Sequence, residues 1–535
     1  MRRVMWAAAI LAIAVLGFLF YPGHTYLEGD TLIYVPMLER LQAPVLFYED
    51  PMISRPHLAL TAYDEITLGL ASFGRWPIEL VLQAQHFLFR ACWVAGIFLI
   101  ALRFGLTPLQ AWLVAALTSL GAVGPTLATV ELEPVPRAFA MGLSVLALGV
   151  AANSRFVEAG VLLAFAFLYH PTSAAPLTAA ALVAIGLRRA RPVLLAPLVA
   201  AVAVLLVLMH NQTGVTESTA LLRRTGELEE ALQRQVMSAG FLTEWSLRNF
   251  LDGLTEAALA ALGWWRLRSR TSSPLRELLG GLAFTAAASL PFNWILRERA
   301  GWALLAGWEP MRAFVYVVLL AAVFAAVCGV LAIDQRRWIE GSAWLAAALV
   351  LPLKEALISR VADPNLIFLT AGLVAAALVG TWLADKTRGA TIVVAGLLPI
   401  VAIPLSGLKP AAPRVLTPGL EQLAAWAKAK TDENSVFLFA DQGPSRGSGA
   451  FRARALRAVY VDYEGRALVN YFPEFTKLWW NRWTDTDRGN WAVTAEDFPR
   501  LASFHIDYVV LRIDEVPNRQ PEYQNAEYRV YRVVR

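Results

Sequence analysis

The sequence is poor in charged residues and nearly free of cysteine, and both absences narrow the class of protein. Only 17% of its 535 residues are Asp, Glu, Lys or Arg, while 57% are hydrophobic and the mean hydropathy is +0.50. Because about a quarter of a soluble chain is charged, this composition excludes an ordinary soluble protein and predicts a membrane protein. The two cysteines, Cys92 and Cys328, lie in separate apolar runs and provide neither a disulfide framework nor a thiolate metal site.

The net charge of +5 does not indicate a nucleic-acid partner, because much of the excess of Arg and Lys lies in short connections between apolar runs. The N-terminus carries Arg2 and Arg3 before an apolar run that ends at Phe20. No small-residue cleavage site precedes Tyr21, so the pattern predicts a retained signal anchor rather than a removed peptide.

Apolar runs long enough to approach a bilayer span recur along the chain, and we expect about thirteen transmembrane helices. They are predicted at 4–20, 78–103, 107–124, 135–152, 156–170, 172–188, 193–209, 249–266, 276–296, 312–333, 338–353, 363–384 and 389–407. With the N-terminus in the cytoplasm, every inner loop contains Arg or Lys, as orientation in a membrane requires. This topology predicts an integral inner or plasma membrane protein whose loops 21–77 and 210–248 and whose C-terminal tail are extracytoplasmic.

The tail has the polar content of an ordinary soluble domain. Period-2 patterns predict strands at 459–463 and 508–512, and helices are expected at 418–430 and 496–504. The predicted fold is therefore mostly α: a polytopic helix bundle over 1–409, followed by a small α/β domain over 410–535. The glycine-rich stretch 443–449 lacks the lysine of a phosphate loop and is interpreted as a mobile loop. Aromatic residues crowd at 471–475 and 479–483, where core packing or membrane docking is favoured over stacking on sugars.

The polar loop 21–77 contains the first motif with chemical character, Glu28-Gly29-Asp30. Helical spacing of apolar residues predicts surface helices at 31–42 and 57–72. Asp30 is the foremost candidate for a catalytic carboxylate, and capping of the helix at 31–42 is its alternative role. Asp50, before Pro51, is interpreted as a turn residue.

A second acidic motif, Glu131-Leu132-Glu133, precedes Pro134 and Pro136 at a predicted outer helix end. Two acids beside helix-breaking prolines are poor material for a spanning helix, so function and an interfacial cap are equal alternatives. Other polar residues are expected at the same face, where single arginines also serve as caps or reach toward lipid headgroups. The candidates for substrate contacts are Glu28, Arg137, His170, Arg297, Arg299, Glu309, Arg312 and Arg360.

Two polar positions within the apolar runs have more than one interpretation. His170 precedes Pro171, so it either closes a helix or binds substrate. His86 and Arg90 lie about one turn apart in the predicted span 78–103. A buried Arg at that depth requires either a hydrogen-bonding partner or an aqueous cavity.

An acidic residue after the first helix, a second acidic motif at the outer end of the third and an outer C-terminal domain together resemble the GT-C superfamily of membrane glycosyltransferases. The matching positions are Asp30, with Glu28, and Glu131 with Glu133. Two departures bear on metal dependence: the first motif is Glu-Gly-Asp rather than Asp-x-Asp, and the second uses glutamates where many members carry aspartate.

The resemblance implies transfer of a hexosyl or pentosyl group from a polyprenyl-phosphate donor to a glycan, lipid or protein acceptor at the outer face. It implies Asp30 as the base and the arginines as partners of the leaving phosphate. Glu131 and Glu133 would orient the acceptor or, with Asp30, hold a divalent cation such as Mg²⁺ or Mn²⁺.

Two other classes fit a polytopic chain, namely a lipid-linked saccharide flippase or transporter and a non-catalytic scaffold for envelope assembly. The lack of recognisable repeated halves argues against transport. An enzyme requires Asp30 to share one outer cavity with Glu131 or Glu133. A separation above about 15 Å, well beyond the spacing of paired carboxylates in glycosidases, would exclude it.

Overall fold

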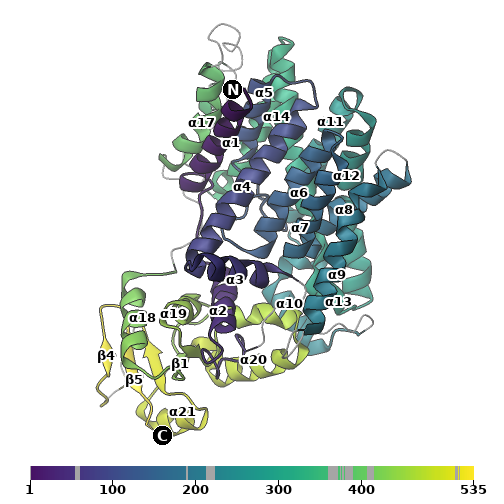
Figure 1. Ribbon diagram of the computed structural model, residues 1–535. Coiled ribbons are helices and arrows are strands. Elements are labelled where there is room, and N and C mark those ends of the chain that lie inside the picture. Colours follow the sequence, from purple (N-terminus) through teal and green to yellow (C-terminus); the bar gives the residue numbers. More distant parts are fainter. Residues whose placement is uncertain are drawn as a thin grey trace.

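The structure is a computed structural model in which a helical bundle is joined to a smaller α/β part (Figure 1). It describes residues 2–54, 61–187, 191–211, 223–359, 372–373, 375, 379, 390–405, 415–512, 516 and 518–534. The mostly helical fold with a small C-terminal sheet confirms the predicted fold class in outline.

Helices stand at the predicted positions throughout the described part of the bundle. They are α1 (Arg2–Leu19), α4 (Ile78–Leu102), α5 (Pro108–Thr118), α6 (Pro136–Ala152), α7 (Phe156–Tyr169), α8 (Pro171–Gly186), α9 (Ala196–Asn211), α11 (Leu247–Leu267), α12 (Ser273–Asn293), α14 (Val315–Asp334), α15 (Trp338–Ser359) and α17 (Ala390–Leu405). The predicted span 363–384 lies outside the described residues. Helix α14 is apolar on every side and is buried almost completely, as such a helix must be.

Within the described part of the chain, four helical segments are long and apolar enough to cross a membrane: Ile78–Leu102, Pro192–His210, Ser273–Arg299 and Leu304–Asp334. The predicted number of about thirteen spans is therefore not confirmed. Several helices are short, and α5, with 11 residues, is an example. At 1.5 Å per residue it covers about 17 Å of a hydrocarbon core that is about 30 Å thick.

Helices α4 and α6 approach each other closely and carry residues of the site described below. A Cβ atom on Gly142 would lie 2.2 Å from the carbonyl oxygen of Phe89, and one on Gly96 would lie 2.4 Å from that of Val145. Small residues permit such backbone contact between membrane helices. These contacts fix α4 and α6 relative to each other.

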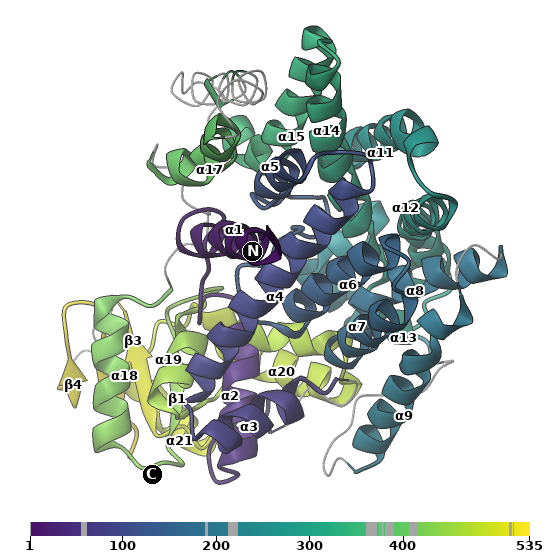
Figure 2. The ribbon, with the colours of Figure 1, turned by 45° about the horizontal axis from the view of Figure 1, so that its top comes forward.

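The loop after α1 contains helix α2 (Thr31–Gln42), as predicted, and helix α3 (Tyr63–Gly74), which overlaps the helix predicted at 57–72 and ends two residues beyond it. The apolar face of α2 packs against protein, and its place at the membrane surface stays a prediction. Its residues Leu32, Met37 and Leu38 are buried, and helix α19 (Gly447–Ala455) packs against it. Figures 1 and 2 show α2 between the bundle and the C-terminal part, which covers the face that the sequence pattern assigned to lipid.

The C-terminal part contains a five-stranded sheet in the order β2-β1-β3-β5-β4. Strands β1 (Val436–Phe439), β2 (Ala458–Val459) and β3 (Tyr508–Leu511) pair in parallel, while β5 (Arg529–Arg532) runs antiparallel to β3 and to β4 (Tyr523–Gln524). Helices α18 (Pro418–Lys430), α20 (Pro473–Asp485) and α21 (Phe498–Ser503) complete it. The boundary near 410 stays a prediction.

Two sequence interpretations in this part have clear outcomes. The glycine-rich stretch 443–449 is not wholly a loop, because α19 begins at Gly447 and its small residues approach Leu32 of α2. The aromatic cluster is core packing: Phe475, Trp479 and Trp483 are buried, and the Trp479 indole donates to the Asp462 carbonyl at 2.9 Å.

Asp50 joins this C-terminal part to the loop after α1. Its Oδ1 accepts the N–H groups of Met52 and Ile53 at 3.0 and 3.3 Å, which confirms a turn residue. Its Oδ2 accepts from Arg452 Nε at 2.6 Å, and Arg452 Nη1 reaches Asp462 at 2.7 Å. This buried ion-pair cluster, Asp50–Arg452–Asp462, is formed by the two parts of the chain together.

Candidate active site

The Glu133 carboxylate is enclosed by the loop that leads into α2. Its Oε1 accepts the N–H groups of Glu28 and Gly29 at 2.9 and 2.6 Å and the Thr31 hydroxyl at 2.9 Å. Its Oε2 accepts the N–H of Thr31 at 3.0 Å. Free N–H groups at a helix start attract an anion, so Glu133 supplies the negative charge that α2 lacks in its own first turn.

Gly29 is required for this enclosure. A Cβ atom at position 29 would lie 2.9 Å from Glu133 Oε2 and 3.2 Å from its Cδ. Contacts this short force the carboxylate or the loop to move. The middle residue of Glu28-Gly29-Asp30 therefore lets the loop fold tightly around Glu133.

Asp30 occupies the N-cap position of α2, but its side chain makes no capping hydrogen bond. Glu133 takes that role, and the capping alternative for Asp30 is wrong. The Asp30 carboxylate instead pairs with Arg137 Nη1. Arg137 also holds Glu131, with Nε donating to Oε1 at 2.6 Å and Nη2 to Oε2 at 3.2 Å. Asp30, Arg137 and Glu131 form what we call the Asp30 cluster.

The Asp30 cluster is open on one side. The side chain of Asp30 is 39% exposed, while those of Arg137 and Glu131 are 17% and 16% exposed. Partial burial opposes the charge of Asp30, but the paired Arg137 and the nearby charges of Arg312 and Arg446 outweigh it and lower the pKa of Asp30. Asp30 is therefore an ionised carboxylate within reach of a ligand at neutral pH.

Arg90, on α4, ties the two acidic loops together. Its guanidinium donates to the carbonyl oxygens of Gly23 at 2.6 Å, Glu131 at 2.7 Å and Gly17 at 3.2 Å. A ring nitrogen of His86 also lies 3.1 Å from the Glu131 carbonyl. The partner that a buried Arg requires is therefore backbone, and Arg90 fixes the position of both loops rather than contacting a ligand.

No protein-family model and no curated protein matches the sequence. Solved structures of two glycosyltransferases do resemble the fold. One is the arabinofuranosyltransferase AftD from Mycobacteria, with a TM-score of 0.46, 14% identity, and coverage of 97% of this chain and 36% of that one. The other is the oligosaccharyltransferase of Archaeoglobus fulgidus in its apo form, with a TM-score of 0.42, 12% identity, and coverage of 95% and 69%. This chain thus spans about a third of the length of AftD.

A second group of predicted site residues lies in the segment between α12 and α14, which contacts Asn470 of the C-terminal part. Glu309 pairs with Arg312 and accepts from Asn470 Nδ2 at 3.1 Å. Arg312 also acts electrostatically on Asp30, so the structure brings Arg312 near the Asp30 cluster.

Arg297 is buried beside this group, with 4% of its surface exposed. Its guanidinium lies 4.2 Å from the centre of the Phe241 ring and donates to the Gly240 carbonyl at 3.4 Å. Its Nε and Nη2 have no hydrogen-bond partner among the residues that the structure describes. A buried guanidinium with free donors can accept an anion.

The other residues predicted to contact substrate interact with other groups of the protein or lie outside the described residues. A ring nitrogen of His170 accepts the N–H of Ser173 at 3.2 Å and so caps α8, which is the structural alternative. Arg299 lies 5.0 Å from the Trp294 ring. Arg360 lies outside the described residues. The Glu28 backbone bonds to Glu133, as given above.

The sequence interpretation missed Arg446 and Glu464, both from the C-terminal part. Arg446 donates to the Glu28 carbonyl at 2.8 Å and pairs with Glu464 at 3.0 Å. Burial, with smaller contributions from Asp462 and Asp30, raises the pKa of Glu464 to about 7. No local pattern marks these residues, because 418 positions separate Arg446 from Glu28.

A metal ion does not fit the three acids as they stand. Among the residues that the structure describes, no group of three His, Cys, Asp or Glu side chains could hold a metal ion. Both oxygens of Glu133 accept hydrogen bonds from the loop, and the Arg137 guanidinium lies between Asp30 and Glu131. The proposed Mg²⁺ or Mn²⁺ would have to displace Arg137, so no step below passes through a metal.

Proposed function

We propose that this protein is a membrane glycosyltransferase that moves a sugar from a polyprenyl-phosphate donor to an acceptor at the extracytoplasmic face. The observation that carries the proposal is the half-exposed, ionised Asp30, held by Arg137 where the two acidic loops meet. A carboxylate fixed in this state can take a proton and can face a developing positive charge.

Asp30 accepts the proton of the acceptor hydroxyl. The acceptor oxygen forms its bond to the anomeric carbon as the bond from that carbon to the phosphate oxygen breaks, and the lipid phosphate leaves with the electron pair. Because the pKa of Asp30 is lowered, the proton passes to it late, after the oxocarbenium-like carbon has made the hydroxyl more acidic. Before that, its charge orients the hydroxyl.

Arginine side chains on the far side of the donor carry the leaving phosphate. Arg297 is the foremost of them, because its Nε and Nη2 are unpaired within the described part of the chain while the guanidinium is buried. Arg312 is committed to Glu309 but lies close enough to Asp30 to affect it. Bidentate contacts from guanidinium groups suit phosphate oxygens and stabilise the charge that grows on departure.

Glu131 and Glu133 act through other residues in this proposal. Glu131 holds Arg137 in place, and Glu133 holds the loop that presents Asp30. The acceptor is a glycan, a lipid or a protein bearing a hydroxyl, and the membrane lipids surround the apolar helices. The N-terminus is cytoplasmic and the C-terminal part extracytoplasmic.

The test is turnover of a panel of polyprenyl-phosphate sugars by the purified protein, comparing wild type with Asp30→Asn. We expect one donor to be consumed and the variant to lose about 10²–10⁴-fold in rate, as for removal of a positioned base. Glu49→Gln, an exposed acid in the same loop, is the matched control and should keep full activity.

Equal rates in wild type and Asp30→Asn would remove Asp30 from the mechanism. Failure to turn over any donor, together with movement of a lipid-linked saccharide across vesicles, would replace the proposal by transport.

A further inference from the structure

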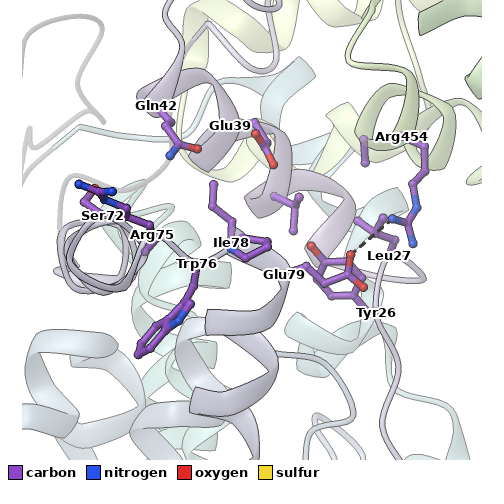
Figure 3. Close-up of a pocket in the computed structure, with 14 residues that line it drawn as sticks. Tyr26, Leu27, Glu39, Gln42, Ser72, Arg75, Trp76, Ile78, Glu79 and Arg454 are labelled. Carbon is purple, nitrogen blue, oxygen red and sulfur yellow. Dashed lines mark hydrogen bonds and ion pairs between the residues drawn. The ribbon is translucent and has the colours of Figure 1, made fainter.

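A cavity of about 600 Å³ lies between α2, α3, the start of α4 and the end of α19 (Figure 3). Its volume falls within the range of about 300–1,000 Å³ typical of small-ligand sites. Tyr26 and Leu27 of the first loop form part of its wall. None of the residues given a role in the reaction lines it, so the cavity is a different place from the Asp30 cluster.

The polar lining of the cavity is balanced in charge. Glu39 and Gln42 come from α2 and Ser72 from α3, while Arg454 pairs with Glu79 at 3.5 Å. Both members of that pair are about 40% exposed, with values of 40% and 43%, so they keep capacity for further hydrogen bonds. Two carboxylates and two guanidinium groups, counting Arg75, match an uncharged ligand that both donates and accepts, which is the chemistry of hydroxyl groups.

An aromatic ring is fixed at one side of the cavity. The Trp76 indole lies directly on Gly74, where a Cβ atom would come within 2.3 Å of its Cδ2. One face of the ring is thus held against the backbone at the end of α3, yet the residue remains 52% exposed. A ring held in this way offers an apolar platform at little cost in side-chain entropy.

The wall of the cavity is continuous with the loop that carries Asp30. The Leu27 N–H donates to the Thr31 hydroxyl at 2.9 Å, and that hydroxyl donates to Glu133. A chain of sugars bound along the wall would therefore lie beside the loop of the proposed base.

We infer that this cavity binds the acceptor as a neutral oligosaccharide, with one sugar stacked on Trp76 and its hydroxyls bonded to Gln42, Glu39 and Glu79. The inference rests on the proposed glycosyl transfer and adds the class of acceptor. It also explains why the cavity combines an exposed ring with paired charges, since sugars present both an apolar face and polar edges.

The alternative role for Trp76 is that of an interfacial anchor in the lipid headgroups, where Trp is common. Phe73 distinguishes the two roles. It is 89% exposed at the end of α3, three positions before Trp76, but it does not line the cavity. An anchor role would make both aromatic residues important for membrane association and neither important for sugar binding.

The experiment measures binding of a panel of neutral di- to hexasaccharides of pentoses and hexoses to the full chain in phosphatidylcholine nanodiscs. Wild type should bind at least one of them. Trp76→Ala should weaken that binding about tenfold, the value of one aromatic stacking contact. Gly74→Ala should weaken it as well, because the methyl group displaces the ring although Trp76 remains. Phe73→Ala should bind as wild type.

The inference is overturned if wild type binds no member of the panel, or if Phe73→Ala loses as much binding as Trp76→Ala. Asp30→Asn should retain glycan binding and lose turnover. Glycan binding without any Asp30-dependent transfer would refute the proposed function alone, whereas Asp30-dependent transfer with unchanged acceptor KM in Trp76→Ala and Gly74→Ala would refute the inference alone.

Discussion

Two arginines in this protein each bridge a pair of carboxylates, and the two clusters differ in their surroundings. Arg137 joins Asp30 to Glu131, and these three side chains are 17%, 39% and 16% exposed. Arg452 joins Asp50 to Asp462, and the corresponding values are 1%, 0% and 2%. The charges are the same, but only the first cluster is accessible to a ligand.

The hydrogen bonds to the carboxylate oxygens show the same difference between the two clusters. In the buried cluster Asp50 Oδ2 also accepts the N–H of Val459 at 3.1 Å, and Asp462 Oδ1 accepts that of Gly465 at 2.8 Å. Its atoms are engaged in holding the C-terminal part onto the loop after α1. The Asp30 cluster leaves part of one carboxylate exposed, which a purely structural ion pair does not require. The two clusters have the same kinds of side chain, so their exposure distinguishes the candidate active site from the ion pairs that hold the C-terminal part in place.

The largest expected effect is on stability, when each central arginine is replaced by methionine. Arg452→Met leaves two buried carboxylates without a partner and should cost about 3–5 kcal/mol. Arg137→Met should cost less than Arg452→Met, because Asp30 is 39% exposed and can be solvated, while it abolishes most of the activity. Unfolding midpoints and turnover measured on the same preparations give both quantities.

The comparison would be broken if the two variants lowered the unfolding midpoint equally, since the Asp30 cluster would then be a second set of structural ion pairs. It would also be broken if Arg137→Met were fully active.

A smaller effect is expected at Glu133, which holds the loop and has no substrate contact in the proposed reaction. Glu133→Gln replaces one acceptor oxygen by an amide donor that faces backbone N–H groups, so the Asp30 loop should shift. A displacement of about 1 Å at a reacting group costs on the order of 10²-fold in kcat. The donor KM should change little, since no phosphate contact is lost.

Gly29→Ala offers an independent way to disturb the same contact, because its methyl group would press on Glu133 Oε2. Gly69→Ala is the matched control, as nothing lies within 4 Å of a Cβ atom there. A loss of kcat in Gly69→Ala equal to that in Gly29→Ala would show that the helices of the loop, rather than Glu133, limit the rate.

Several residues of the candidate site could be predicted from the sequence, because the ends of helices are marked by breaks in the apolar pattern. Asp30 and Glu131 each stand beside a break in apolar periodicity, and α2 begins at the predicted Thr31. The turn role of Asp50 was predicted, but its pairing with Arg452 and the role of Glu133 could not be, because both depend on partners that are distant in sequence. Glu133 binds N–H groups more than 100 positions away, and Asp50 binds Arg452 across 402 positions. Residue type and spacing do not show which carboxylate will be buried by a partner so far away in the sequence.

The smallest expected effect concerns Glu464, which interacts electrostatically with Asp30 in one cluster and Asp462 in the other. Its pKa is raised to about 7 in the folded protein, above the value near 4.3 of an unfolded chain. Between these values the folded state binds more protons at this carboxyl, so the contribution of Glu464 to stability should be greatest below about pH 4.3 and fall as the pH rises to about 7. The lowered pKa of Asp30 has the opposite sign, because its contribution is lost only as the pH falls below the ordinary range of an Asp carboxyl. Unfolding midpoints across this range should show a decline that is smaller in Glu464→Gln and unchanged in Asp30→Asn. A decline in Glu464→Gln as large as in wild type would assign it to other carboxyls, such as Asp64, whose pKa burial raises to about 8.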